Sequence, residues 1–114
     1  MTIKQAILSL PKISKRWSSG YNDDDGTVAQ LIVNEKQKLY LSTNSSIAYF
    51  HAATLTFGYE ISYKFDFETA KYIPVVILLN QGVELDISQP FKTPALAIQA
   101  AFITAVKDKV AEMK

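Results

Sequence analysis

Cysteine is absent from this chain of 114 residues, and histidine occurs once. The chain therefore cannot form disulfides, build a cysteine-based zinc site or supply several histidines to one metal ion. An excess of one charge is also lacking, because 12 Lys+Arg against 11 Asp+Glu leave a formal net charge of +1. That balance gives no bulk electrostatic argument for nucleic acid or an acidic membrane as a partner. We expect no metal and no cofactor.

Secretory signals and membrane spans are missing as well. The apolar run at residues 7–10 is too short for a signal core and ends at Pro11. Residues 39–59 carry no full charge, but serine, threonine and asparagine interrupt them too often for a membrane span. We therefore predict a cytoplasmic protein with no membrane partner.

The composition is that of a globular protein, with 48% hydrophobic and 20% charged residues. A chain of this length and composition forms one domain and is too apolar to be disordered. We predict a single α+β domain over residues 1–114. Residues 1–27 form a helix with a basic connector and an acidic loop, and residues 28–114 form the sheet and the remaining helices.

The N-terminal segment begins with a helical pattern. Apolar residues at i, i+3, i+4 and i+7 predict a helix over residues 2–10, with Thr2 as N-cap and Pro11 as the stop. Residues 11–17 read as a basic connector. Residues 18–27 are rich in Gly, Ser, Asn and Asp, which predicts a loop.

The middle of the chain predicts strands. Residues 28–34 and 39–43 form a hairpin around a polar turn. Residues 59–67 alternate strictly, which indicates a half-buried strand with an aromatic face. That face comprises Tyr59, Ile61, Tyr63, Phe65 and Phe67.

A second group of strands follows. Residues 72–79 are almost wholly apolar, so we expect a more central strand with Pro74 near its start. Residues 80–82 predict a turn, and residues 83–87 a short return strand.

Residues 45–57 fit two structures equally well. Alternate residues are apolar, as in a strand, and a helical stripe is also present. Asn44 or Ser45 can serve as a helix cap, and Gly58 stands where a C′ glycine belongs. Periodicity alone does not decide between the two.

A helix over residues 94–112 is signalled clearly, with Thr93 as N-cap and Pro94 as the first helical residue. An apolar stripe must cover the sheet, and the opposite face is small or polar. The stripe is Ile98, Phe102, Val106 and Val110, joined by Leu96, Ile103 and Met113, and the opposite face is Ala97, Ala101, Thr104 and Asp108. We thus expect an antiparallel sheet of about four or five strands with helices packed on it.

The candidate ligand-binding residues are Lys12, Lys15, Arg16, Trp17 and Tyr21. Cations beside an aromatic ring can hold a phosphate and stack on a base. In the alternative interpretation, Trp17 anchors the core and the cations are solvated. The sequence leaves both interpretations open.

Three adjacent carboxylates, Asp23, Asp24 and Asp25, are candidate protein-partner residues; the alternative is a solvated acidic turn. Their spacing does not fit an EF-hand loop. No catalytic residue is predicted, because no nucleophile elbow or phosphate loop is present and His51 is the single histidine. We therefore expect a protein that is not an enzyme.

Two segments resemble a known family. Residues 90–102 (PFKTPALAIQAAF) are similar to the "TPALALxxAAL" ending of the phage alpha-beta-alpha sandwich proteins, small phage and prophage proteins. Residues 40–48 (YLSTNSSIA) resemble that family's "YTSSIDAA" stretch, and residues 58–59 match its Gly–aromatic strand start. The similarity covers roughly residues 39–106, and residues 56–59 (TFGY) replace the usual "PEGW".

This resemblance implies a helix at residues 45–57, helices packed on a small sheet, and a phage or prophage origin. It implies no catalytic residue. Our first hypothesis is a non-enzymatic phage accessory protein in the host cytoplasm that inhibits a host-defence complex by binding it. The alternatives are sequestration of a small anionic ligand, such as a nucleotide signal, across a homo-oligomer interface, and weak nucleic-acid binding through the same cations.

Overall fold

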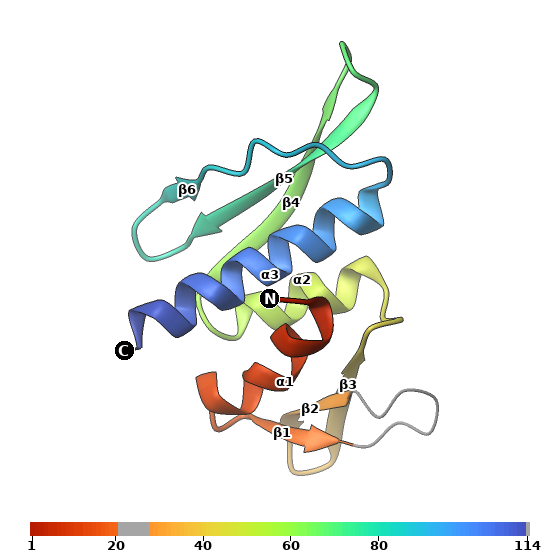
Figure 1. The fold of residues 1–114 in the computed structure, drawn as a ribbon. Coiled ribbons are helices and arrows are strands. Elements are labelled where there is room, and N and C mark those ends of the chain that lie inside the picture. The colour runs from red at the N-terminus through yellow and green to blue at the C-terminus, as the bar shows by residue number, and fades with distance from the viewer. Residues whose placement is uncertain (21–27, 114) are drawn as a thin grey trace.

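The described part of the chain forms three helices and two separate three-stranded antiparallel sheets (Figure 1). The structure, a computed structural model, describes residues 1–20 and 28–113. The α+β class is confirmed, but the strands divide into two sheets instead of sharing one. The elements are α1 (Ile3–Ile13), β1 (Trp17–Gly20), β2 (Val28–Asn34), β3 (Gln37–Ser42), α2 (Ile47–Leu55), β4 (Tyr59–Asp66), β5 (Lys71–Leu78), β6 (Val83–Leu85) and α3 (Pro94–Glu112).

Helix α1 begins as the sequence predicts. The Thr2 side chain accepts a hydrogen bond from the Gln5 amide at 3.1 Å, and the Gln5 side chain accepts one from the Thr2 amide at 2.8 Å. The predicted stop at Pro11 is wrong, because the helix continues to Ile13. A proline in the last turn removes a single amide donor, and the Ser14 amide still closes the helix end on the Leu10 carbonyl at 3.2 Å.

The N-terminal sheet has the order β1-β2-β3. The predicted hairpin between β2 and β3 is confirmed, with a register irregularity between Ile32 and Asn34. The loop predicted over residues 18–27 is wrong at its start, because Trp17–Gly20 pairs with β2 as a strand, and its residues 21–27 lie outside the described residues. Backbone hydrogen bonding to the edge of β2 outweighs the low strand propensity of serine and glycine.

The C-terminal sheet has the order β4-β5-β6, so β5 is central as predicted. Pro74 lies in this central strand, at a position where pairing on the β6 side of β5 is interrupted. Tyr72 exchanges both backbone hydrogen bonds with Phe91, at 2.8 and 2.7 Å, and β6 pairs with β5 only from Val76 onward. Alternation places the missing donor of Pro74 on this same side, in the gap between the two pairings.

Residues 47–55 form helix α2, so the ambiguous segment is helical. The N-cap is Ser46 and not Asn44 or Ser45. The Ser45 hydroxyl instead accepts a hydrogen bond from the Ser42 amide at 2.9 Å in the preceding turn. Gly58 follows the helix with φ +92°, a conformation that favours glycine.

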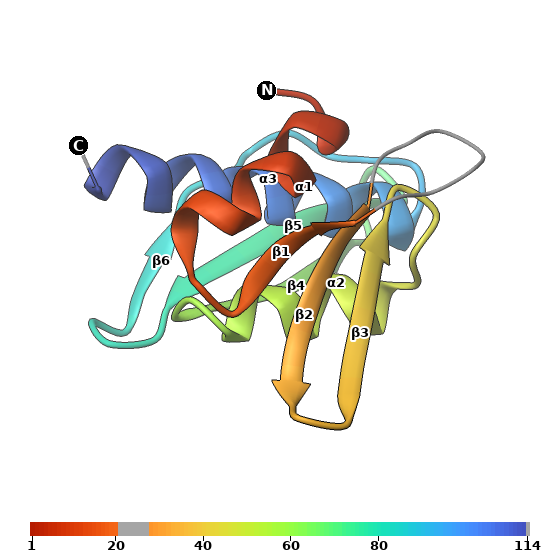
Figure 2. The ribbon, with the colours of Figure 1, turned by 90° about the horizontal axis from the view of Figure 1, so that it is seen from below.

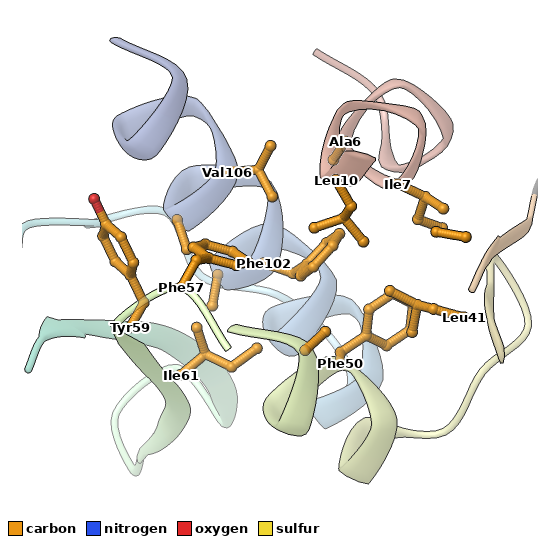
Figure 3. Close-up of a cluster of buried hydrophobic side chains, with 14 of the residues drawn as sticks. Ala6, Ile7, Leu10, Leu41, Phe50, Phe57, Tyr59, Ile61, Phe102 and Val106 are labelled. Atoms are coloured by element: carbon orange, nitrogen blue, oxygen red, sulfur yellow. The ribbon is translucent and has the colours of Figure 1, made fainter. Parts of the chain in front are cut away.

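Helix α3 is the centre of the molecule. It begins at the predicted N-cap, Thr93, whose hydroxyl accepts from the Leu96 amide at 3.2 Å. Its apolar stripe is buried at Ile98, Phe102 and Val106 and half-buried at Ile103 and Val110, whereas Leu96 and Met113 are exposed. On the opposite face Ala97 and Ala101 are buried as well, because α3 contacts α1 and α2 in addition to β4 and β5. Figure 3 shows Phe102 between Phe50 of α2 and Ile61 of β4. The Phe50 and Phe102 ring centroids are 5.1 Å apart.

Helices α1 and α2 link the two sheets. Both contact the N-terminal sheet as well as α3 (Figures 1 and 2). In the described part of the chain, no helix is long and apolar enough to cross a membrane.

Candidate functional site

The predicted basic cluster is divided by the structure. Lys12 lies in the last turn of α1, Lys15 and Arg16 lie in the turn before β1, and all three are exposed. Trp17 points inward and is only 5% exposed. Its indole Nε1 donates to the Thr56 hydroxyl at 3.0 Å, which ties β1 to the end of α2. Trp17 is therefore a core anchor, and its ring is not presented for stacking on a base.

The other predicted site residues, Tyr21, Asp23, Asp24 and Asp25, lie outside the described residues. Among residues 1–20 and 28–113, no group of three or more acidic or histidine side chains is arranged to hold a metal ion.

An apolar hollow adjoins Trp17, between the N-terminal sheet and α2. Its cavity volume is about 10 Å³. Its lining is Trp17, Leu31, Leu39, Tyr40, Leu41, Tyr49, Ala52 and Ala53. Small-molecule sites usually measure about 300–1,000 Å³ and offer a few convergent polar groups. This hollow is below that range, and its walls supply little to hold a phosphate.

A more polar hollow of about 240 Å³ lies where β4 meets the C-terminal end of α3. Tyr59 stands in its wall, and the Tyr59 hydroxyl donates a hydrogen bond to Asp108. Burial, followed by the neighbouring carboxylate, raises the pKa of the Tyr59 phenol well above its ordinary value. The Tyr59–Asp108 hydrogen bond forms a bridge between β4 and α3.

The most distinctive surface is the outer end of the β4–β5 hairpin, which stands clear of the helices (Figure 1). Tyr59 and Ile61, at the inner end of β4, are buried as the alternation predicts. The same aromatic face continues outward past the helices, where Tyr63 and Phe65 are each 41% exposed and Phe67 is 89% exposed. The prediction that this whole face is buried is therefore wrong for its outer half.

Four rings form a connected cluster at this end, here called the aromatic patch: Tyr63, Phe65, Phe67 and Tyr72. Tyr63 meets Tyr72 at a centroid distance of 5.5 Å, and Phe65 meets Tyr72 at 5.2 Å. Phe65 also meets Phe67 at 5.0 Å with an interplanar angle of 88°. Edge-to-face contacts of this kind contribute about 0.5–1.5 kcal/mol each, so the rings hold one another in place.

The turn that carries the patch is fixed by side-chain hydrogen bonds. The Asp66 carboxylate accepts from the Glu68 amide at 3.1 Å and from the Thr69 hydroxyl at 2.8 Å. Ala70 completes the turn with φ +55°. Lys64 and Asp66 alternate with the rings along β4, so their side chains lie on the opposite face of the sheet and the patch itself is apolar.

The sequence did not single out these four residues as a site, because alternation predicts the same burial for every residue on one face of a strand. A usable signal was present, however. A strand of eight residues spans about 27 Å, which is more than the width of one covering helix. An aromatic face of that length can be covered only in part by a single helix.

Comparisons with protein-family models, with curated proteins and with solved structures found no match to this chain. The resemblance to the phage alpha-beta-alpha sandwich proteins therefore stays a prediction.

Proposed function

We propose that this protein is a non-enzymatic phage accessory protein of the host cytoplasm that binds a host protein of an anti-phage defence system through the aromatic patch. The observation that carries the proposal is the exposure of Phe67, 89%, at the tip of a hairpin whose neighbouring rings are held by mutual contacts. The similarity of residues 40–48 and 90–102 to small phage proteins supports the phage setting.

The patch has the chemistry of an energetic centre for binding. Aromatic residues dominate such centres, and burying one large apolar side chain fully contributes about 1.5–3 kcal/mol. The Phe65 contacts to Phe67 and Tyr72 restrict the rings before any partner arrives. Restriction in the free protein lowers the entropy that binding must overcome.

The proposal is tested by comparing two serine variants with the parent chain. Phe67→Ser removes the most exposed ring of the patch, whereas Leu8→Ser removes an apolar side chain that is 49% exposed on α1. We expect the parent and Leu8→Ser to retain the same host protein from a lysate, and Phe67→Ser to retain at least tenfold less. The purified host protein should then bind the parent directly and with the same ranking.

Protection of an infecting phage gives a second readout. Expression of the parent or of Leu8→Ser should restore plaque formation on a host that carries the defence system, and Phe67→Ser should not. Equal retention and equal protection by Phe67→Ser would show that the patch is not the binding surface.

The small-ligand alternative predicts a different result. A nucleotide held by the exposed cations would raise the melting temperature, and Arg16→Ala would abolish that rise. Trp17 gives this alternative little support, because its ring is buried and its Nε1 is already paired with Thr56.

A further inference from the structure

Strand β4 has one open edge. In the described part of the chain, β4 pairs with β5 alone, from Tyr59↔Leu78 to Asp66↔Lys71, and its register has no irregularity. A regular, aromatic edge strand of this length is a template for pairing with another strand. Its outer half contains no proline and no bulge, which are two of the devices that usually block such pairing.

The hydrogen bonds identify which backbone groups face this edge. The Leu79 amide donates to the Gly58 carbonyl at 3.0 Å, whereas Tyr72 exchanges its bonds with Phe91 on the opposite side of β5. Backbone groups of an antiparallel strand point to alternate sides. The register therefore turns Ser62 and Lys64 toward β5, and it leaves the N–H and C=O groups of residues 63 and 65 pointing outward.

The inner half of β4 is less accessible than the outer half. Helix α2 contacts β4, and Ile61 in the inner half of β4 is buried. The outer half projects beyond both helices (Figure 1). A second strand therefore has room only along residues 62–67.

We propose that a second copy of this chain pairs antiparallel with the outer half of β4, about a two-fold axis at Phe65. In that register Lys64 lies opposite Asp66 of the second copy, and Tyr63 lies opposite Phe67 of the second copy. The symmetry repeats each contact, so two Lys–Asp pairs form. The backbone groups of Phe65 in the two copies, which face outward, then bond to each other.

The charges of β4 select this register. A two-fold axis at Lys64 or at Asp66 would place each of these residues opposite its own copy, and an axis at Tyr63 would place Asp66 opposite Glu60. Like charges directly opposite on neighbouring strands are destabilising. An axis at Ser62 also pairs opposite charges, but it runs the second copy along the inner half, beside α2.

Existing contacts leave both charged groups free to form the new pairs. Lys64 reaches Glu84 at 3.4 Å, and both side chains of this pair are at least half exposed, so the contact is weak. Asp66 holds the turn, but each carboxylate oxygen can accept a further hydrogen bond. Pairing uses the strand edge, whereas the proposed host partner uses the faces of the rings, so this inference does not depend on the proposed function.

Charge reversal tests the register by analytical ultracentrifugation of the purified chain. The parent should be a dimer. Both Lys64→Asp and Asp66→Lys should raise the dimer dissociation constant by about tenfold or more, because each substitution puts residues of like charge opposite each other at both symmetry-related 64–66 pairs. The two variants mixed together should dimerise, since each then meets the opposite charge. The control Lys36→Asp changes the same charge in the β2–β3 turn and should dimerise like the parent.

Amide exchange followed by NMR tests the edge without any substitution. The amides of Tyr63 and Phe65 should become protected as the protein concentration rises, whereas those of Ser62 and Lys64 should be protected at every concentration. The proposal is overturned by a parent chain that stays monomeric up to its solubility limit. It is also overturned by Lys64→Asp dimers as stable as the parent's, by a mixture that remains monomeric, or by concentration-independent exchange at Tyr63 and Phe65.

Discussion

The bond between Trp17 and Thr56 offers a quantitative test of how β1 is attached to α2. The Thr56 hydroxyl accepts from the Trp17 indole at 3.0 Å and donates to the Ala53 carbonyl at 2.6 Å. Thr56→Val keeps the shape of the side chain and removes both bonds. An unpaired donor in a site that is 5% exposed costs about 1–3 kcal/mol of unfolding free energy.

The expected change in melting temperature follows from the size of the chain. With about 2.1 cal/mol/K of unfolding entropy per residue, 114 residues give about 240 cal/mol/K. Each kcal/mol then lowers the midpoint by about 4 °C, so Thr56→Val should lower it by about 4–12 °C. Fluorescence is a clean probe of this site, because Trp17 is the single tryptophan.

A double-mutant cycle separates the indole bond from the bond to Ala53. In a Trp17→Phe background, Thr56→Val removes only the hydroxyl's bond to the carbonyl, which contributes about 0.5–1.5 kcal/mol. We therefore expect a coupling of about 1 kcal/mol or more between the two sites, measured by urea unfolding with circular dichroism. An equal cost of Thr56→Val in both backgrounds would refute the reasoning, because the indole bond would then contribute nothing.

Three further predictions follow from other contacts. The pKa of the Tyr59 phenol is raised above its unfolded value of 10.0, so the unfolded chain releases the proton first as the pH rises. The stabilisation from Tyr59 is therefore fully present below about pH 10 and declines above it. Urea titrations at increasing pH should show this decline in the parent chain, and Tyr59→Phe should lose it. Thr93→Ala should cost about 1 kcal/mol of unfolding free energy, whereas Ser46→Ala should cost close to nothing, because the Thr93 side chain makes a cap bond and the Ser46 side chain makes none; chemical denaturation measures both. Phe102→Ala should cost about 3–5 kcal/mol and leave a marginally folded chain with a lowered urea midpoint, since the ring is fully buried against Phe50.

Local signals in the sequence predicted the element types well. The caps at Thr2 and Thr93 and the alternation in β4 are short-range features, and the structure has each of them. Residues 45–57 fitted both the strand period and the helix period, because apolar residues stand at the positions that each period requires. The choice of helix depends on Phe50 meeting Phe102, a contact between distant segments that no local pattern contains.

The division into two sheets also depends on distant contacts. Alternating patterns predict that a segment forms a strand, but they do not identify the strand with which it pairs. β1 was missed because its serines and glycine carry no strand signal and its pairing with Leu31 and its neighbours supplies the stabilisation. The aromatic patch was missed for a similar reason, since exposure at Phe65 and Phe67 depends on where α3 stops covering the hairpin.

The central position of α3 has a consequence for synthesis on the ribosome. Both β4 and β5, and both other helices, pack against this one helix, and it is the last of the described elements to leave the exit tunnel. Until it emerges, the inner face of β4 and the buried side of α2 have nothing to cover them. A nascent chain stalled before residue 94 should therefore be recognised by chaperones and cut readily by proteases, and protection should appear abruptly once α3 is free to dock.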